Sequence, residues 1–199
     1  MNTQYWNKFY SELKKSEPSS FAQFCLQYLS TDDTLLDVGC GDGRDSLFFM
    51  EKVKNVISID NSTQSIENLK KYSNDNNDFQ VLDINSLSTY DILNTRKIDV
   101  VYCRFLLHAI KEDRENILLK WASSTLQPGG RIMIESRTTE DETKPKYYDN
   151  HYRRFTNVEQ LRSKLISLNF NIIYEIQGTG LSPYHDLEDP HLVRIIAEI

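Results

Sequence analysis

The chain has 199 residues, of which 39 % are hydrophobic and 26 % are charged, and these values predict one soluble globular domain with a buried core. Its formal net charge is −6 and its sequence pI is near 5.3, so no nucleic-acid partner is expected, because proteins that grip a phosphate backbone carry a basic face. No apolar stretch approaches the ~20 residues of a membrane span and the first residues lack a signal-peptide core, so we expect a cytoplasmic protein.

The first 30 residues carry aromatic and apolar side chains at helical intervals. Pro18 divides this region into two predicted helices, because proline interrupts the helical hydrogen-bond ladder. The side chains that define the pattern are Tyr5, Trp6, Phe9, Tyr10, Leu13, Phe21, Phe24, Cys25, Tyr28 and Leu29. We expect residues 1–30 to form a helical lid or cover, and residues 31–199 to form the main part of a single domain.

Short apolar runs and helical patterns alternate along the middle of the chain. The runs predicted as strands are Leu35–Val38, Val56–Ile59, Phe79–Leu82, Ile98–Cys103 and Arg131–Glu135. The predicted helices are Ser46–Val53, Thr63–Tyr72, Leu87–Asn94 and Arg114–Thr125. Strands separated by helices imply right-handed parallel crossovers, so we predict a doubly wound, Rossmann-like sheet.

The last part of the chain departs from this alternation. A predicted helix at Asn157–Ser167 is followed by two strands, Phe170–Ile176 and Leu192–Ile199, without a helix between them. Two such strands predict an antiparallel hairpin at the sheet edge. The predicted fold class is therefore α/β, with a seven-stranded sheet that is mostly parallel and has one antiparallel edge strand.

Glycines stand at alternate positions directly after the first strand, in the pattern Asp37-x-Gly39-x-Gly41-x-Gly43. Glycine lets the backbone turn sharply and approach a ligand closely. A dinucleotide fingerprint requires a further glycine where this chain has Arg44, which argues against a nicotinamide cofactor. A tight strand-to-helix turn without a ligand is the alternative interpretation.

Three further features follow later strands. Asp60 ends the second strand, where a carboxylate accepts both hydroxyls of a ribose or caps the next helix. Asp83 and Ile84 follow the third strand, and Pro128-Gly129-Gly130 precedes the fifth. Together with the glycine motif, these features resemble class I S-adenosylmethionine-dependent methyltransferases from about Thr34 to Ile199.

The resemblance implies S-adenosylmethionine as cofactor and assigns roles to several side chains. Asp37 is expected to face the amino-acid part of the cofactor, Asp60 the ribose, and Asp83 the adenine amino group. The full set of expected cofactor contacts is Asp37, Gly39, Cys40, Gly41, Gly43, Asp60, Asn61, Asp83, Ile84 and Cys103. Because Cys25, Cys40 and Cys103 are odd in number and lack a CxxC spacing, we expect neither a disulfide framework nor a metal site.

The acceptor is expected at the carboxyl edge of the sheet, where doubly wound folds bind their ligands. Guanidinium, imidazole and phenol groups after the fourth and fifth strands suit a phosphate or carboxylate. The predicted acceptor-binding residues are Arg104, Arg137, Tyr148, His151, Arg154 and His185. Candidates for a general base are His151, His185 and His108, for which packing is an equal alternative. For residues 135–154 the alternative is a solvated loop whose charges pair with Glu140, Asp141 and Glu142.

The sequence therefore predicts a metal-independent O-methyltransferase acting on a small anionic acceptor, such as a phosphate, phosphonate or phosphoramidate ester or a phosphorylated carbohydrate. The Asp189-Pro190-His191 segment and the basic block at residues 151–155 resemble small bacterial O-methyltransferases of surface-polysaccharide or phosphonate and phosphoramidate type. The alternatives are methylation of a thiol, a nitrogen or an oxyanion such as tellurite, and a non-catalytic protein with the same fold.

Overall fold

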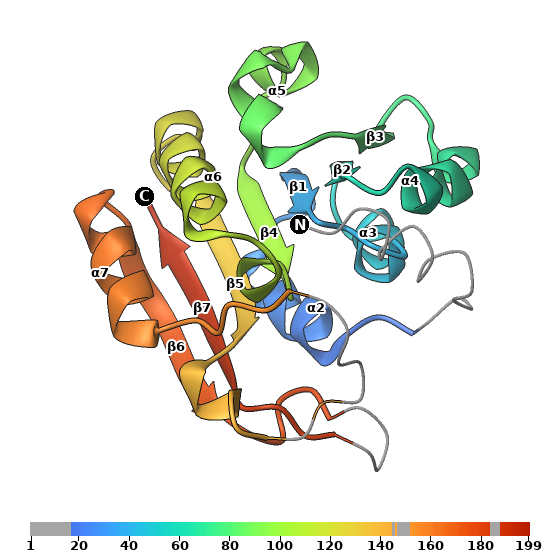
Figure 1. Ribbon diagram of the computed structural model, residues 1–199. Coiled ribbons are helices and arrows are strands. Elements are labelled where there is room, and N and C mark those ends of the chain that lie inside the picture. Colours follow the sequence, from blue (N-terminus) through green and yellow to red (C-terminus); the bar gives the residue numbers. More distant parts are fainter. Residues whose placement is uncertain (1–16, 145, 147–151, 184–187) are drawn as a thin grey trace.

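The computed structural model describes residues 17–144, 146, 152–183 and 188–199. Within these residues the strands form one seven-stranded sheet with the order β3-β2-β1-β4-β5-β7-β6 (Figure 1). The strands are β1 Thr34–Val38, β2 Asn55–Asp60, β3 Asn77–Val81, β4 Val100–Arg104, β5 Arg131–Arg137, β6 Asn171–Gly178 and β7 Leu192–Glu198. The order reverses between β1 and β4, as in a doubly wound sheet, so the predicted fold class is confirmed.

The predicted hairpin at the sheet edge is also confirmed. The last strand, β7, pairs antiparallel with both β5 and β6, so β7 is the reversed strand and β6 forms the edge itself. The register between β6 and β7 shifts between Ile172 and Tyr174, which leaves one extra residue in β6. Such a bulge bends an edge strand and disfavours pairing with a further strand.

Helices pack on both faces of the sheet (Figure 1). In the described residues the α-helices are α2 Ser20–Cys25, α3 Arg44–Phe49, α4 Thr63–Leu69, α5 Asp91–Thr95, α6 Glu112–Thr125 and α7 Val158–Ser167. The 3-10 helices are η1 Leu26–Tyr28, η2 Lys70–Tyr72, η3 Ile84–Thr89, η4 Leu107–Ala109 and η5 Thr139–Asp141. None of these helices is both long and apolar enough to cross a membrane.

The helix predicted at Leu87–Asn94 is wrong as a single element. The chain forms η3 and then α5, with a break at Tyr90. The Asp83 carboxylate accepts a hydrogen bond from the backbone N–H of Asn85 at 2.9 Å and so starts a tight turn earlier than the apolar pattern indicates. The first of the two predicted N-terminal helices lies outside the described residues, whereas α2 confirms the second.

The core is divided by the sheet because alternate strand residues point to opposite faces. On one face Leu36 and its neighbours pack against α6 and α7 through side chains such as Leu118 and Leu165. On the other face Leu35 belongs to a cluster with Phe21 of α2 and Phe49 of α3. The sheet is thus buried on both sides, which explains its near-continuous apolar strands.

One buried carboxylate joins three neighbouring strands. Glu135 of β5 is fully buried and accepts hydrogen bonds from Arg104 of β4, at 2.8 Å, and from Arg194 of β7, at 2.6 Å. Arg194 also donates to the hydroxyl of Ser20 and to the carbonyl of Leu181, so this group ties α2 and the β6–β7 connection to the sheet.

We expect Glu135→Gln to lower the free energy of unfolding by about 3–5 kcal/mol, because two buried guanidinium groups lose their shared counter-ion. Urea denaturation measures this loss. The matched control is Glu198→Gln, which removes the half-buried partner of Arg131 and should cost less than about 1 kcal/mol. Equal losses in the two variants would contradict a special role for Glu135.

Candidate cofactor and acceptor site

The turn from β1 into α3 depends on backbone conformations that favour glycine. Gly39, Gly41 and Gly43 have φ values of +77°, +56° and +73°. A Cβ atom on Gly39 would lie 2.9 Å from Leu106 Cδ1, and one on Gly43 would lie 2.5 Å from Leu69 Cδ2. A side chain at Gly39 or Gly43 would therefore strain the backbone and displace a leucine side chain, so the glycines keep the turn closely packed.

Asp60 at the end of β2 holds the middle of this turn. Its Oδ2 accepts from the N–H of Gly41 at 3.1 Å, and its Oδ1 accepts from the N–H of Ser62 at 2.8 Å. Ser65 donates its hydroxyl to the Gly41 carbonyl, so both polar backbone groups of that glycine are bonded. Burial raises the pKa of the Asp60 carboxyl, while the backbone donors act in the opposite direction. The N-cap of α4 is Ser62, whose hydroxyl accepts from the N–H of Ser65, and Asp60 links this cap and the glycine turn to the end of β2.

Several predicted cofactor residues meet at one cavity of about 20 Å³. Its lining consists of Val38, Gly39, Ile59, Asp60, Asn61, Leu82, Ile84, Leu106 and Arg114. The cavity therefore brings together three kinds of group. They are the backbone of a glycine, a carboxylate able to accept hydrogen bonds from hydroxyls, and apolar side chains suited to a purine. These residues fit an adenosyl group.

Asp37 lies in β1 beside this turn and is almost fully buried. Its Oδ2 accepts a hydrogen bond of 2.5 Å from the Ser46 hydroxyl of α3. Burial, together with the nearby carboxylates of Asp45, Asp60 and Asp42, raises the pKa of Asp37 to about 8. Near neutral pH the side chain is therefore largely protonated, and a cationic ligand beside it favours the carboxylate form.

The two predicted cysteine contacts lie in the core. Cys103 is fully buried, and its thiol lies 3.7 Å from the Met133 carbonyl of the adjacent strand. Cys40 packs in a cluster with Ile66, Leu69 and Phe79. Neither side chain lines the cavity, because the strand and turn that carry them direct the thiols toward apolar neighbours. The expected cofactor contacts of Cys40 and Cys103 stay predictions.

Asp45 is a supporting residue that the sequence reasoning missed. Its carboxylate accepts hydrogen bonds of 2.7 Å each from the backbone N–H and the hydroxyl of Ser19 and from the Tyr102 hydroxyl. These bonds join the start of α2, the start of α3 and β4 beside the glycine turn. An acid in the first turn of a helix is common, so the sequence carries no distinct signal for this role.

Arg114 is a second missed residue. It belongs to α6, donates to Asp83 Oδ2 at 2.8 Å and lines the cavity described above. Asp83, which was expected to face the adenine amino group, does not itself line that cavity. Because 31 positions separate the two residues in the sequence, no local pattern indicates their pairing.

His108 is buried and occupies a structural position. Its Nδ1 accepts from the backbone N–H of Arg137 at 3.2 Å and lies 3.3 Å from the Ser136 hydroxyl. An accepting Nδ1 places the proton of the neutral ring on Nε2. This arrangement supports the packing alternative for His108. The other two candidate bases, His151 and His185, and the predicted acceptor residue Tyr148 lie outside the described residues.

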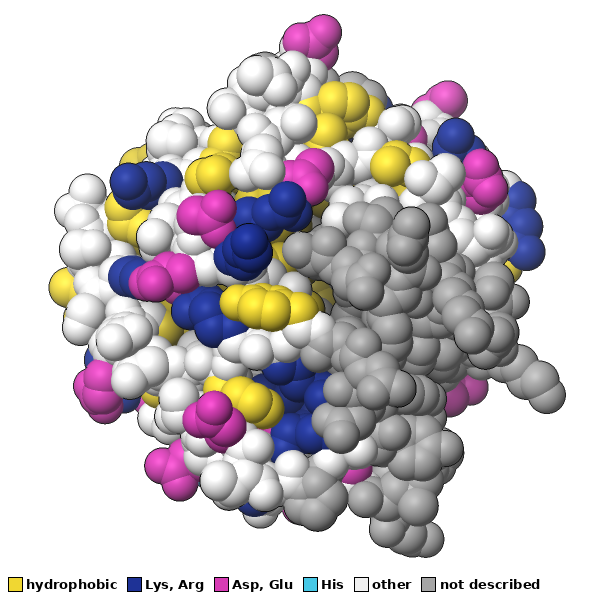
Figure 2. Space-filling view, in the orientation of Figure 1, with side chains coloured by type: hydrophobic (Ala, Val, Ile, Leu, Met, Phe, Trp, Pro, Cys, Tyr) yellow, Lys and Arg dark blue, Asp and Glu magenta, His cyan; other side chains and the backbone are white. Residues whose placement is uncertain are grey.

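The three arginines predicted to face an anion all have carboxylate partners within the protein. Arg104 pairs with Glu135, and Arg154 pairs with Glu115. Arg137 pairs with Asp141 at 2.8 Å and also with Glu188. Figure 2 shows basic side chains across the middle of this face with acidic side chains beside several of them. The solvated-loop alternative agrees with these pairs only in Asp141, because Glu135, Glu115 and Glu188 are not the carboxylates it names. The predicted contact of these arginines with an acceptor stays untested.

Phe105 directly follows β4 with a left-handed backbone, at φ +54°. This conformation costs a residue other than glycine roughly 1–2 kcal/mol, so the surroundings must impose it. Its N–H donates to the Glu135 carbonyl at 2.8 Å, and its ring centre lies 4.1 Å and 5.9 Å from the guanidinium carbons of Arg104 and Arg137. A partly exposed aromatic ring between two cations therefore stands at the carboxyl edge of the sheet.

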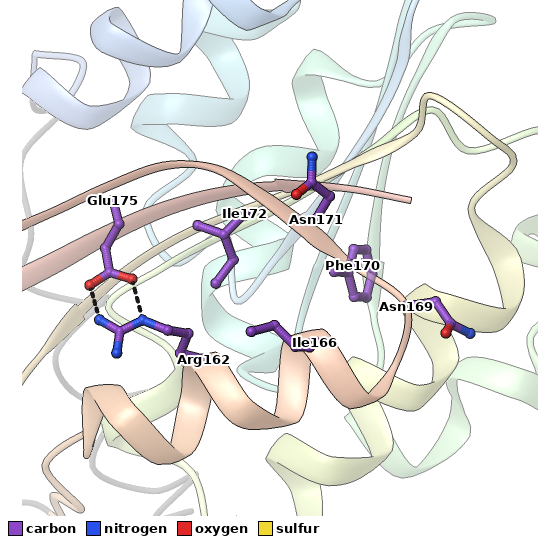
Figure 3. Close-up of a pocket in the computed structure, with 7 residues that line it drawn as sticks. All are labelled: Arg162, Ile166, Asn169, Phe170, Asn171, Ile172 and Glu175. Atoms are coloured by element: carbon purple, nitrogen blue, oxygen red, sulfur yellow. Dashed lines mark hydrogen bonds and ion pairs between the residues drawn. The ribbon is translucent and has the colours of Figure 1, made fainter.

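A separate cavity of about 540 Å³ lies between α7 and the edge strand β6 (Figure 3). Arg162 and Glu175 form a two-bonded ion pair at this cavity, with distances of 3.0 Å and 2.6 Å. Its lining residues include none of the predicted site residues, and β6 lies at the opposite edge of the sheet from β3. This cavity is thus not part of the candidate site.

A comparison with known protein families identifies the class of protein that has this fold and this glycine turn. Residues 10–172 match a family described as a methyltransferase domain, so the chain belongs to that family. Its fold is that of S-adenosylmethionine-dependent methyltransferases. The predictions of fold, family and enzyme class are therefore confirmed, whereas the resemblance to polysaccharide or phosphonate enzymes stays a prediction.

Solved structures of this fold include S-adenosylmethionine-dependent methyltransferases from Methanosarcina mazei and Anabaena variabilis. The first is 19 % identical, with a TM-score of 0.73 over 88 % of this chain and 96 % of that chain. The second is 17 % identical, with a TM-score of 0.76 over 98 % and 92 %. A 1,6-didemethyltoxoflavin-N1-methyltransferase from Burkholderia thailandensis, solved with S-adenosylhomocysteine, is 20 % identical, with a TM-score of 0.65 over 89 % and 76 %.

A curated relative is the tRNA N(3)-methylcytidine methyltransferase trm141 of Schizosaccharomyces pombe. It is 29 % identical over 157 residues, which make up 71 % of this chain. The matched part spans 62 % of that protein's length.

We expect Asp60→Ala to weaken binding of S-adenosylhomocysteine by ~1–3 kcal/mol, because a buried acceptor for ribose hydroxyls is lost. Isothermal titration calorimetry measures the change. Asp99→Ala is the matched control, since Asp99 also accepts from a backbone N–H, that of Thr34, but lies at the amino end of β4. Unchanged affinity in a folded Asp60 variant would remove this residue from the site.

We also expect cofactor affinity to rise with pH between about 6 and 8. Asp37, with its pKa near 8, is protonated in the free protein and loses its proton when a cation binds, so binding releases up to about one proton near pH 7. Calorimetry in buffers of different ionisation enthalpy counts this proton. In Asp37→Asn the released proton should disappear, and an unchanged proton count would show that another group titrates.

Proposed function

We propose that the chain transfers the methyl group of S-adenosylmethionine to an anionic oxygen of a small acceptor that carries a phosphate or carboxylate. When bound, the cofactor supplies a methyl group on a charged sulfur that leaves readily. The residues of the chain then have to hold the cofactor, place the acceptor oxygen and exclude competing orientations. An oxygen that is already anionic needs no general base, which agrees with the structural role of His108.

The position of Arg137 and its two carboxylate partners are the observation that supports an anionic acceptor. Arg137 ends β5, its guanidinium carbon lies 5.9 Å from the ring centre of Phe105, and the guanidinium is held by Asp141 and Glu188. Asp141 is buried and anchored, because it also accepts from the backbone N–H of His191 at 2.9 Å. Glu188 belongs to the connection between β6 and β7 rather than to the sheet.

The local charge balance determines how an acceptor anion would bind. The cations Arg104, Arg194, Arg137 and Lys146 share the carboxylates of Glu135, Asp141 and Glu188. Arg137 itself already has two carboxylate partners, so an incoming anion has to compete with one of them for its guanidinium. Glu188 is the one outside the sheet framework, so we propose that the acceptor exchanges with Glu188 on Arg137.

A nucleobase nitrogen in RNA is the second candidate acceptor. The similarity to a tRNA N(3)-methylcytidine methyltransferase favours it. Tyr152, which is exposed, and the neighbouring Arg153 supply an aromatic ring and a cation of the kind that contact bases and phosphates. The net charge of −6 weighs against it, because a polyanion is repelled over a distance of about 10 Å.

The first test measures release of S-adenosylhomocysteine from purified protein with S-adenosylmethionine and a cell extract. The extract is divided into small molecules retained on an anion exchanger, small molecules in the flow-through, and purified tRNA. Turnover with the retained small molecules alone supports the proposal. Turnover with tRNA favours the second candidate, and turnover with the flow-through alone overturns both.

We expect Arg137→Gln to raise the acceptor KM by about tenfold or more while the affinity for S-adenosylhomocysteine is unchanged, because a charged hydrogen bond to the acceptor is lost. Glu188→Gln should act in the opposite direction and lower the acceptor KM, since the competing carboxylate is removed. Steady-state kinetics with an active acceptor measures both. If Glu188→Gln raises the KM as Arg137→Gln does, Glu188 supports the site and the exchange is wrong.

A further inference from the structure

Arg114 connects two parts of the molecule that the sequence places far apart. Its side chain begins in the first turn of α6 and reaches the carboxylate of Asp83, which follows β3. The side chain of Arg114 is 22 % exposed and that of Asp83 is 34 % exposed, so the pair is partly open to solvent rather than buried in the core.

The cavity lining separates the roles of these two residues. Arg114 contributes to the lining together with Gly39, Asp60 and Ile84, whereas Asp83 does not. Asp83 uses one oxygen for the N–H of Asn85, at 2.9 Å, and the other for Arg114, at 2.8 Å. The carboxylate thus holds the guanidinium by a hydrogen bond, and Arg114 is the member of the pair that lines the cavity.

The small size of the cavity means that a ligand that enters it meets the lining side chains. A volume of about 20 Å³ holds roughly one water molecule, so a nucleoside that enters has to displace or contact the side chains around it. Ile84 and Leu106 offer apolar surface to a flat ring, and Arg114 offers a flat cation. A guanidinium stacks on aromatic rings and is less strongly hydrated than an ammonium group, which makes it suited to this position.

We propose that Arg114 binds the adenine ring of the cofactor directly, by stacking its guanidinium on the ring, while Asp83 holds the guanidinium in position. This inference rests on the proposed use of S-adenosylmethionine. It gives α6 a part in cofactor recognition that none of the sequence motifs contains.

The test is calorimetric titration of the protein with S-adenosylhomocysteine and with its inosine analogue, which lacks the adenine amino group. We expect Arg114→Met to raise Kd between about threefold and thirtyfold for both ligands, because stacking does not depend on the amino group. Arg114→Lys keeps the charge but not the flat group, and should lose most of the same affinity. Arg131→Met is the matched control, since Arg131 also pairs with a half-buried glutamate but lies at the amino end of β5.

Three results would overturn the inference. Arg114→Met with wild-type affinity shows that the guanidinium makes no contact with the ligand. Arg114→Lys with wild-type affinity shows that charge alone suffices. Loss of affinity for the adenosine ligand but not for the inosine ligand shows that Arg114 acts only through Asp83. If the wild-type protein binds neither ligand, the cofactor proposal itself fails, which separates that failure from the others.

Discussion

The turn between β1 and α3 is the constraint on which the candidate site depends. Gly39 and Gly43 combine positive φ values with contacts to Leu106 and Leu69 that a Cβ atom would disturb. Asp60 bonds the N–H of Gly41, so the end of β2 is fixed to the same turn. Because β1, β2 and the start of α3 are held together here, the bare backbone and the carboxylate reach one cavity. Asp45 extends this assembly to α2 and β4 through Ser19 and Tyr102.

A second principle organises the acceptor side, where buried charges share partners within the protein. Glu135 neutralises arginines from β4 and β7 and links three strands in doing so. Such a group adds little net stability compared with apolar packing, but the loss of one member is costly. The same pairing limits what an arginine at a methyltransferase site indicates about the substrate. A guanidinium indicates an anionic substrate only when its internal partner is able to leave, which is why Arg137 and Glu188 carry the proposed acceptor contact.

The two halves of the site differ in how far they could be predicted. On the cofactor side, Gly39, Asp60, Asn61 and Ile84 were predicted from the sequence and line one cavity. These residues could be predicted because a glycine turn and the end of a strand both depend on residues that are close together in the sequence. On the acceptor side, the predicted arginines are present at the expected edge, but their partners were not identified. The left-handed Phe105 was missed because no spacing reveals the φ of a residue other than glycine.

The sequence by itself determined the order of strands and helices, the doubly wound α/β class, the closing hairpin and the glycine turn. The spacing of hydrophobic residues and the positions of proline and glycine affect only a few neighbouring residues. These signals can therefore be identified in the sequence alone. Only the tertiary structure decided that Arg104 meets Glu135 and that Arg114 meets Asp83, each 31 positions away, and that Arg137 meets Glu188, 51 positions away. Ion pairs form between groups that the folded sheet brings together, and the spacing of charges in the sequence does not specify which carboxylate each arginine will find.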